Sequence, residues 1–255
     1  MTFDGTLYAA NTAHHRAHDA EVLAGVPLSS GDRVLDVGCG SGDFTASLVP
    51  LVAPGGRVVG VDVSPSQVEH ARAHHPGAEF VVGRAQDVGA LFPPQSFDVV
   101  VSVATLHWVP DADQTSALAG VARVLRPGGT LRIDMGGAGQ IAAAREVLDE
   151  VSTSVGGPAS PWYFPTPDAY RQRLEAAGLA VRHAELVRQR RSFPDPAAFE
   201  GWLRSQILPA YLPGIAAERR AEFAHACLAA GLERLRRDDG SYDQDYVRLD
   251  VLAER

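Results

Sequence analysis

The sequence predicts an α/β fold in which a seven-stranded, mostly parallel sheet lies between helices. Residues 33–52 form an apolar strand that ends in an acid, a glycine-rich loop and a helix. Strands, helices and turns then alternate in one consistent register up to residue 134, which is stronger support than any single motif. The apolar run at 99–103 indicates a strand that is buried on both faces, as in a parallel sheet.

The loop after the first strand suits a ligand that approaches the backbone closely. At Gly38, Gly40 and Gly42 a side chain would hold such a ligand away, and the turn needs φ angles that other residues resist. The following N–H groups point out of a helix N-terminus, which suits a carboxylate or phosphate. A dinucleotide site needs a third glycine where Asp43 stands, and this carboxylate would repel a pyrophosphate. S-adenosylmethionine carries an ammonium and a sulfonium, so acids at Asp36 and Asp43 suit it better.

The same stretch resembles the first motif of a known family. Asp36-x-Gly38-x-Gly40-x-Gly42 is similar to that motif in the class I S-adenosylmethionine-dependent methyltransferases. The resemblance implies a Rossmann-like fold with an antiparallel last strand. It also implies S-adenosylmethionine as cofactor and S-adenosylhomocysteine as product, with Cys39 among the residues that bind them.

The second strand, 57–63, supplies the next expected cofactor contact. It ends in Asp62, about twenty residues after the glycines, where a ribose-binding carboxylate belongs. A charged acceptor strengthens the hydrogen bonds that two ribose hydroxyls can donate. Val63 is expected to pack beside the adenine plane. Ser64 is predicted to be the N-cap of the next helix, followed by a proline, with Gln67 completing a capping box. Gln67 is also expected to contact the cofactor.

The third strand, 79–83, leads into a departure from the family pattern. Many methyltransferases with these first two motifs have an acid directly after the glycine, where it meets the adenine amino group, but Arg84 stands there in this chain. We therefore expect backbone atoms of Ala85 and Gln86 to bind the adenine edge, with Asp87 as a nearby acid.

The end of the fourth strand is expected to lie beside both ligands. Ligands of open α/β sheets gather beyond the carboxyl ends of the strands, so Ser102 should face the methionine part of the cofactor and the acceptor. The segment 107–111 resembles that of small-molecule methyltransferases such as the trans-aconitate group. His107 is a candidate general base or a structural histidine, and Trp108 is expected in the core rather than in a pocket.

Residues 1–30 are expected to form a helix that folds over the cofactor as a lid. The candidate lid, substrate-contact or general-base residues in it are Tyr8, His14, His15 and His18. His14 and His18 share a helix face, but no acid or cysteine follows at a diagnostic interval, so no metal site is expected.

Composition excludes several classes of function. With a formal net charge of -8 over 255 residues, the chain is not expected to bind nucleic acid, because neutralising phosphates requires a basic face. Two cysteines are too few for a disulfide framework. No apolar run approaches the length of a membrane span, so we expect a cytoplasmic protein. Its expected oligomeric state is a monomer or a homodimer.

The second half of the chain is expected to hold the acceptor. Residues 31–137 would form the cofactor-binding core, and 138–255 the last strands with an inserted helical cap. The segments 162–170 and 201–205 look similar to the trans-aconitate methyltransferase branch, which methylates a carboxylate of a small acid. The residues expected to enclose the acceptor are Trp162, Tyr163, Trp202 and Tyr211.

The expected chemistry is methyl transfer to a small molecule, chiefly by alignment of the reacting atoms. A carboxylate acceptor needs no base, whereas a hydroxyl or an amine benefits from one. O-methylation of a carboxylate or hydroxyl and N- or C-methylation of a natural product therefore remain open. The same residues leave room for an RNA or protein methyltransferase, for a cofactor-binding module without catalysis, and for a nicotinamide-dependent oxidoreductase.

Overall fold

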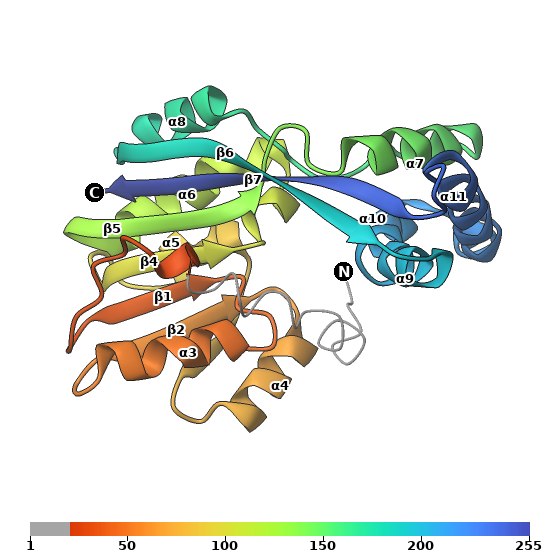
Figure 1. Ribbon diagram of the computed structural model, residues 1–255. Coiled ribbons are helices and arrows are strands. Elements are labelled where there is room, and N and C mark those ends of the chain that lie inside the picture. Colours follow the sequence, from red (N-terminus) through yellow and green to blue (C-terminus); the bar gives the residue numbers. More distant parts are fainter. Residues whose placement is uncertain (1–20) are drawn as a thin grey trace.

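The computed structural model describes residues 21–255, and Figure 1 shows their arrangement. One seven-stranded sheet has the strand order β3-β2-β1-β4-β5-β7-β6. Neighbouring strands from β3 to β5 are parallel, whereas β7 is antiparallel to both β5 and β6. The predicted mostly parallel sheet with an antiparallel last strand is confirmed. The strands are β1 (Arg33–Val37), β2 (Arg57–Asp62), β3 (Glu79–Val82), β4 (Phe97–Val103), β5 (Leu125–Gly136), β6 (Ala180–Phe193) and β7 (Tyr242–Glu254).

Alternate residues of the central strands pack on opposite faces of the sheet. Val34 belongs to a cluster with the side chains of α3 (Asp43–Val52). Leu35 belongs to the larger core, which includes side chains of α6 (Gln114–Val124) and α8 (Pro167–Ala176). This follows from the two-residue side-chain period of a strand. Both faces of the central strands are therefore buried, as the apolar run of β4 predicts.

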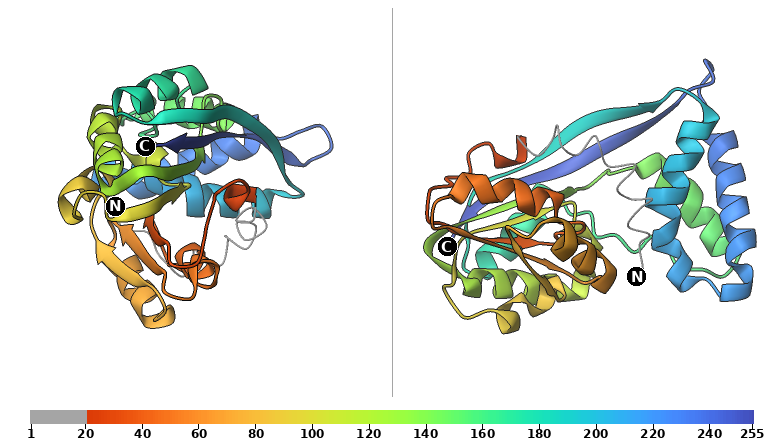
Figure 2. Two further views of the ribbon diagram at one scale, coloured as in Figure 1. Left: turned by 90° about the vertical axis from the view of Figure 1, so that its left-hand side faces the viewer. Right: turned by 90° about the horizontal axis from the view of Figure 1, so that it is seen from below.

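A helical cap lies beyond one end of the sheet. Strands β6 and β7 extend past the parallel strands and carry the cap at their far ends (Figures 1 and 2). The carboxyl ends of the parallel strands point toward this cap (Figure 1), which is where such sheets bind ligands. The cap helices are α7 (Ala142–Ser154), α9 (Pro196–Trp202), α10 (Leu208–Tyr211) and α11 (Arg220–Arg234), with a π-helical turn at Leu203–Ile207.

The remaining elements flank the ligand-binding edge. They are α4 (Pro65–His74), α5 (Val88–Leu91) and the short 3₁₀ turns η1 (Ala85–Asp87), η2 (Leu106–Trp108) and η3 (Asp111–Asp113). The 3₁₀ turns η1 and η2 follow the carboxyl ends of β3 and β4, respectively.

The sequence predicts that Asp111 caps α6, with Gln114 at the third position as in a capping box, and the start of this helix differs from that prediction. Asp111 does not cap this helix, because it lies in η3 and its carboxylate pairs with Arg173. Gln114 is fully buried, and its Nε2 donates to the carbonyl oxygens of Leu106 and Val109 at 2.8 and 2.9 Å. The side chain thereby holds the loop after β4 in place rather than closing a capping box.

Two segments rich in arginine, 182–191 and 219–237, form ion pairs with acidic side chains. Arg182 and Glu254 pair at 2.7 Å, and Arg234 and Glu150 at 2.5 Å. In residues 21–255 no helix has the length and apolarity needed to cross a membrane. The same residues contain no cluster of three or more His, Cys, Asp or Glu side chains suited to hold a metal ion.

Candidate active site

The three glycines of the loop after β1 serve two purposes. Their φ angles are 86° at Gly38, 51° at Gly40 and 85° at Gly42. A Cβ at Gly38 would lie 2.0 Å from Thr105 Oγ1, and one at Gly42 would lie 2.8 Å from Ala71 Cβ. A Cβ at Gly40 would meet no described atom within 4 Å. Gly40 thus faces open space, whereas Gly38 and Gly42 make room for the protein's own side chains, which corrects the expectation that all three admit a ligand.

The carboxylate of Asp62 is fixed beside Gly40. Its Oδ2 accepts a hydrogen bond from the Gly40 N–H at 3.0 Å, and its Oδ1 accepts one from the Ser64 N–H at 2.9 Å. Each carboxylate oxygen keeps a further lone pair that can accept from a hydroxyl group. The two bonds connect the loops after β1 and β2 and orient the acid before any ligand arrives.

These loops fit S-adenosylmethionine. Val63 is 54% exposed, so a large apolar side chain faces solvent directly after Asp62. An exposed apolar surface suits a nucleoside base, an oriented carboxylate suits ribose hydroxyls, and the open Gly40 allows a ligand to reach the backbone. Asp36 lies beneath the loop, is 2% exposed, and accepts a hydrogen bond from Thr45 Oγ1 at 2.6 Å.

Three other predicted cofactor residues have buried side chains. The Cys39 thiol packs in a small apolar cluster, and burial, with help from nearby carboxylates, raises its pKa, which keeps it neutral. Ser102 Oγ donates to the Val37 carbonyl oxygen at 2.8 Å, so it does not face the methionine part of a cofactor as expected. Gln67 is buried at the start of α4, where its N–H donates to Ser64 Oγ at 3.5 Å, in agreement with the predicted N-cap.

The expected adenine edge lies in η1. Gln86 Nε2 donates to Asp113 Oδ2 at 3.1 Å, so the side chain of Gln86 is directed at η3 and its backbone remains the candidate contact, with that of Ala85. The Asp87 carboxylate accepts from Arg84 Nε at 2.8 Å. The Asp87 carboxylate, which was expected near the adenine, is therefore already paired with Arg84 at the protein surface.

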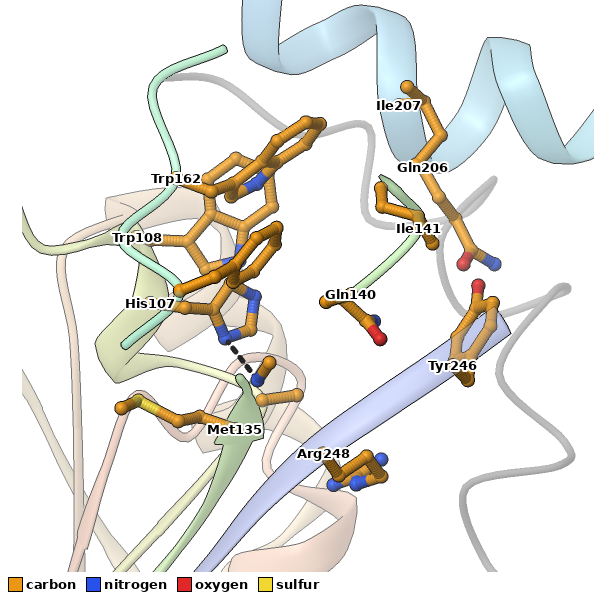
Figure 3. A pocket seen from close by; sticks show the side chains of 13 residues that line it. His107, Trp108, Met135, Gln140, Ile141, Trp162, Gln206, Ile207, Tyr246 and Arg248 are labelled. Atoms are coloured by element: carbon orange, nitrogen blue, oxygen red, sulfur yellow. Dashed lines mark hydrogen bonds between the residues drawn. The ribbon is translucent and has the colours of Figure 1, made fainter. Parts of the chain in front are cut away.

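A cavity of about 100 Å³ lies between the carboxyl ends of β4 and β5 and the cap (Figure 3). One water molecule needs roughly 10 to 15 Å³ of such space, so the cavity has room for a small molecule. Aromatic side chains form one wall, and the polar side chains, with Ile141 and Ile207 among them, lie across from it (Figure 3). Its lining residues are Ala104, His107, Trp108, Met135, Gly136, Gln140, Ile141, Trp162, Phe164, Gln206, Ile207, Tyr246 and Arg248.

Backbone strain is concentrated at this cavity. Ala104 has a φ of 52° and Ile141 one of 44°, and both residues line the cavity. Such conformations cost free energy in residues other than glycine and cluster at functional sites. Gly136 also belongs to the lining, and a Cβ there would lie 2.4 Å from the Phe164 ring. The glycine thus lets Phe164 close the aromatic wall.

His107 is placed as a hydrogen-bond donor rather than as a general base. Its Nδ1 accepts from the Gly136 N–H at 3.2 Å, so the proton of the neutral ring is on Nε2 (Figure 3). Burial, assisted by the charge of Arg248, lowers the pKa of His107 to about 3. A neutral ring with an occupied Nδ1 and a protonated Nε2 has little capacity to take a proton from an acceptor.

The aromatic residues of the cap divide into cavity and core. Trp162 lines the cavity, as predicted, and stacks on Phe164 with ring centroids 5.9 Å apart. Trp108, which the sequence places in the core, also lines the cavity, and its ring meets that of Trp162 edge-on. Together with His107 these rings form a continuous aromatic wall.

The other three predicted pocket residues lie outside the lining. Tyr163 packs beside Tyr170 in the main core, with the Arg173 guanidinium 5.1 Å from its ring centroid. Trp202 is buried behind the cavity. Tyr211 is also buried there, and its hydroxyl donates to Asp149 Oδ1 at 2.8 Å. Trp202 and Tyr211 fill the core of the cap, whereas the partly buried Tyr163 packs against the main core.

Four polar lining residues were not found from the sequence: Gln140, Gln206, Tyr246 and Arg248. Arg248 is directly opposite Gly136 in the sheet register and pairs with Asp134. The sequence of β7 does contain a pattern that could have indicated two of them. Residues 242, 244, 246 and 248 share one face of the strand, and the apolar residues from 247 to 253 share the other. The candidates Tyr8, His14, His15 and His18 lie outside the described residues.

Comparisons with known proteins give the family. A methyltransferase domain family matches residues 34–129. A trans-aconitate 2-methyltransferase of Paracidovorax citrulli is 30% identical over 250 residues, which cover 92% of this chain and 91% of that protein. An uncharacterised methyltransferase of Schizosaccharomyces pombe is 33% identical over 175 residues, 66% of each chain.

A solved structure supports the same assignment at the level of the fold. A putative methyltransferase of Bacillus halodurans superposes with a TM-score of 0.65 at 21% identity, over 93% of this chain and 98% of that one. The matched domain spans residues 34–129, a range that includes the glycine loop and Asp62. The chain belongs to the class I S-adenosylmethionine-dependent methyltransferases.

Proposed function

We propose that this methyltransferase acts on a small carboxylic acid and transfers the methyl group to a carboxylate oxygen. The observation that carries the proposal is the donor character of the cavity: His107 offers an Nε2–H and is not placed to act as a base, and the Arg248 guanidinium, which pairs with Asp134, also lines the cavity. These groups suit an anionic acceptor. The name of the Paracidovorax relative, a trans-aconitate 2-methyltransferase, supports the same class of acceptor.

Each end of the site has a distinct task. Asp62 would accept hydrogen bonds from the ribose hydroxyls, Val63 would pack on the adenine, and the open backbone at Gly40 would admit the methionine part. The bound cofactor supplies an electrophilic methyl group on a sulfonium, which a nucleophilic oxygen can take in one displacement. Alignment is then the main contribution of the protein.

The protonation states of the lining fit an acceptor that is already ionised. A carboxylate has no proton to lose, so the neutral His107 can hold it by donation from Nε2. Burial raises the pKa of Tyr246, so its phenol also stays protonated and is not a base. The apolar wall of Trp162 and Phe164 excludes water and strengthens these contacts.

The test uses methyl-labelled S-adenosylmethionine with trans-aconitate, other small polycarboxylic acids, and matched amides, phenols and amines. Mild alkali releases labelled methanol from a methyl ester, but not from methyl ethers, N-methyl groups or C-methyl groups. We expect label in an acid, released by alkali. Alkali-stable label, or label in RNA or protein alone, would overturn the proposal.

Two variants serve as internal controls. Arg248→Gln should raise the KM for the acid and leave cofactor affinity unchanged, because Arg248 lines the acceptor cavity and does not belong to the loops after β1 and β2. Asp62→Ala should instead lower cofactor affinity. In the wild type, kcat should show no decline with a histidine-like pKa between pH 6 and 8, because His107 is neutral throughout this range.

A further inference from the structure

The end of the cavity opposite His107 presents an unusual amide. Gln206 comes from the π-helical turn Leu203–Ile207, and its side chain points to the phenol end of Tyr246, across the cavity from the aromatic wall (Figure 3). Single π-helical turns are rare and occur frequently at functional sites. This turn places a long polar side chain between two buried apolar residues of the cap, Leu203 and Ile207.

The hydrogen bonds of Gln206 leave one donor group unused. Its Oε1 accepts from an Arg191 guanidinium nitrogen at 3.5 Å, whereas its Nε2 is buried and has no hydrogen-bond partner in the described residues. A guanidinium can only donate, so the oxygen of the amide must face it and the NH₂ group must be the other end. Buried donors without a partner are costly and require an explanation such as a ligand.

Tyr246 adds a second donor at the same place. Its phenol oxygen accepts from Arg191 at 3.0 Å and from Trp202 Nε1 at 2.8 Å. Because both lone pairs of the oxygen are occupied, its own proton is directed at a third group. Burial raises the pKa of this phenol, so the proton remains. The Arg191 guanidinium lies 5.5 Å from the ring centroid of Tyr246 and adds positive charge nearby.

The cavity therefore has donors at both ends and an apolar wall between them. His107 and Arg248 lie at the end next to β5, and Gln206 and Tyr246 at the end next to the cap (Figure 3). An acceptor with a single carboxylate would satisfy only one end. We propose that Gln206 and Tyr246 bind a second carboxylate, remote from the one that is methylated, and that Gln206 sets the preference for dicarboxylic over monocarboxylic acids. This inference rests on the proposed carboxylate methylation.

The experiment compares a diacid with a monoacid of the same length whose remote carboxylate is replaced by a methyl group. Gln206→Glu keeps an oxygen for Arg191 but removes the NH₂ donor and adds a charge that repels the second carboxylate. Gln206→Leu removes the donor without adding charge. Gln172→Ala, on the exposed surface of α8, is the matched control, because its side chain does not line the cavity and belongs to a different element from Gln206, Arg191 and Tyr246.

For Gln206→Glu we expect the ratio of kcat/KM for the diacid to that for the monoacid to fall about 10- to 100-fold. Gln206→Leu should lower this ratio less, and Gln172→Ala should leave it unchanged. The affinity for S-adenosylhomocysteine should be equal in all four proteins, which controls for misfolding.

Two failures are distinguishable. If the wild type methylates acids but the ratio is the same in the wild type, Gln206→Glu and Gln206→Leu, the role of Gln206 is wrong and the proposed function stands. If the wild type methylates no acid of either kind, the proposed function itself fails, and the inference fails with it. Binding of the diacid to the wild-type complex with S-adenosylhomocysteine, measured by calorimetry and lost in Gln206→Glu, supports the inference without relying on turnover.

Discussion

In the proposed site, the cofactor end and the acceptor end are built in different ways. The cofactor end uses backbone groups of two adjacent loops, locked by contacts such as those of Gly38 with Thr105 and of Gly40 with Asp62. The acceptor end uses side chains from β5, β7, η2 and the cap, which meet only in the folded protein. Substitutions at the first end should therefore cost stability or cofactor affinity, and substitutions at the second should change acceptor selection.

The sharpest test of this contrast is a pair of glycine variants. Gly38→Ala combines a left-handed backbone with a clash against Thr105, so we expect a loss of roughly 2 to 5 kcal/mol in the free energy of unfolding. Gly40→Ala has open space and should lose only about 1 to 2 kcal/mol. It should instead bind S-adenosylhomocysteine more weakly. Urea unfolding and calorimetry measure both quantities, and equal stability losses would contradict the division of roles.

Asp62→Ala should weaken binding of S-adenosylhomocysteine by about 1.5 to 3 kcal/mol, the range for hydrogen bonds to a charged group. The KM for the acceptor, measured at saturating cofactor, should stay the same because Asp62 does not line the acceptor cavity. Unchanged affinity would refute the ribose assignment, and a changed acceptor KM would mean that the two ends are coupled.

His107 gives the acceptor end a characteristic pH dependence. Its pKa is near 6.5 when unfolded and about 3 when folded, so between these values the unfolded state binds more protons. The contribution to stability is complete above about pH 6.5 and is lost by about 1.4 kcal/mol for each pH unit below it. From pH 6.5 to 5 this amounts to about 2 kcal/mol.

The corresponding variant is His107→Gln, which cannot take up the proton. The free energy of unfolding, measured with urea, should fall between pH 7 and 5 by about 2 kcal/mol more in the wild type than in the variant. If the free energy of unfolding has the same pH dependence in both proteins, His107 takes up a proton in the folded state, and it would again be a candidate base.

The smallest expected effect is at Tyr211, outside the cavity. Tyr211→Phe removes the hydrogen bond to Asp149 and should cost roughly 1.5 kcal/mol of stability. The KM for the acceptor should not change. Trp162→Ala, which opens the aromatic wall, should raise the KM for the acceptor. A raised KM in Tyr211→Phe with an unchanged KM in Trp162→Ala would show that the cavity lining is assigned incorrectly.

The same contrast explains which features could be predicted from the sequence. The strands, the loop around Gly40 and the position of Asp62 depend on neighbouring residues and on a regular strand period, both of which are visible in one sequence. Whether Gly38 faces a ligand or Thr105 depends on a loop 67 residues away, and so does not follow from the motif.

The acceptor end could be predicted only in outline. Large rings such as Trp202 and Tyr211 fill cores as readily as pockets, and their type does not distinguish the two uses. Tyr246 and Arg248 belong to a strand in which polar and apolar residues alternate, and this alternation alone does not show that the polar face lines a cavity. Gln206 reaches the cavity through a π-helical turn, for which the sequence gives no simple signal.

The most direct test of the proposed site is a crystal structure of the protein with S-adenosylhomocysteine and a small dicarboxylic acid. We predict ribose hydroxyls on Asp62, one carboxylate beside His107 and Arg248, and the other beside Gln206 and Tyr246. An acid bound outside the cavity, or a carboxylate at only one of its two ends with the other end filled by water, would contradict this assignment.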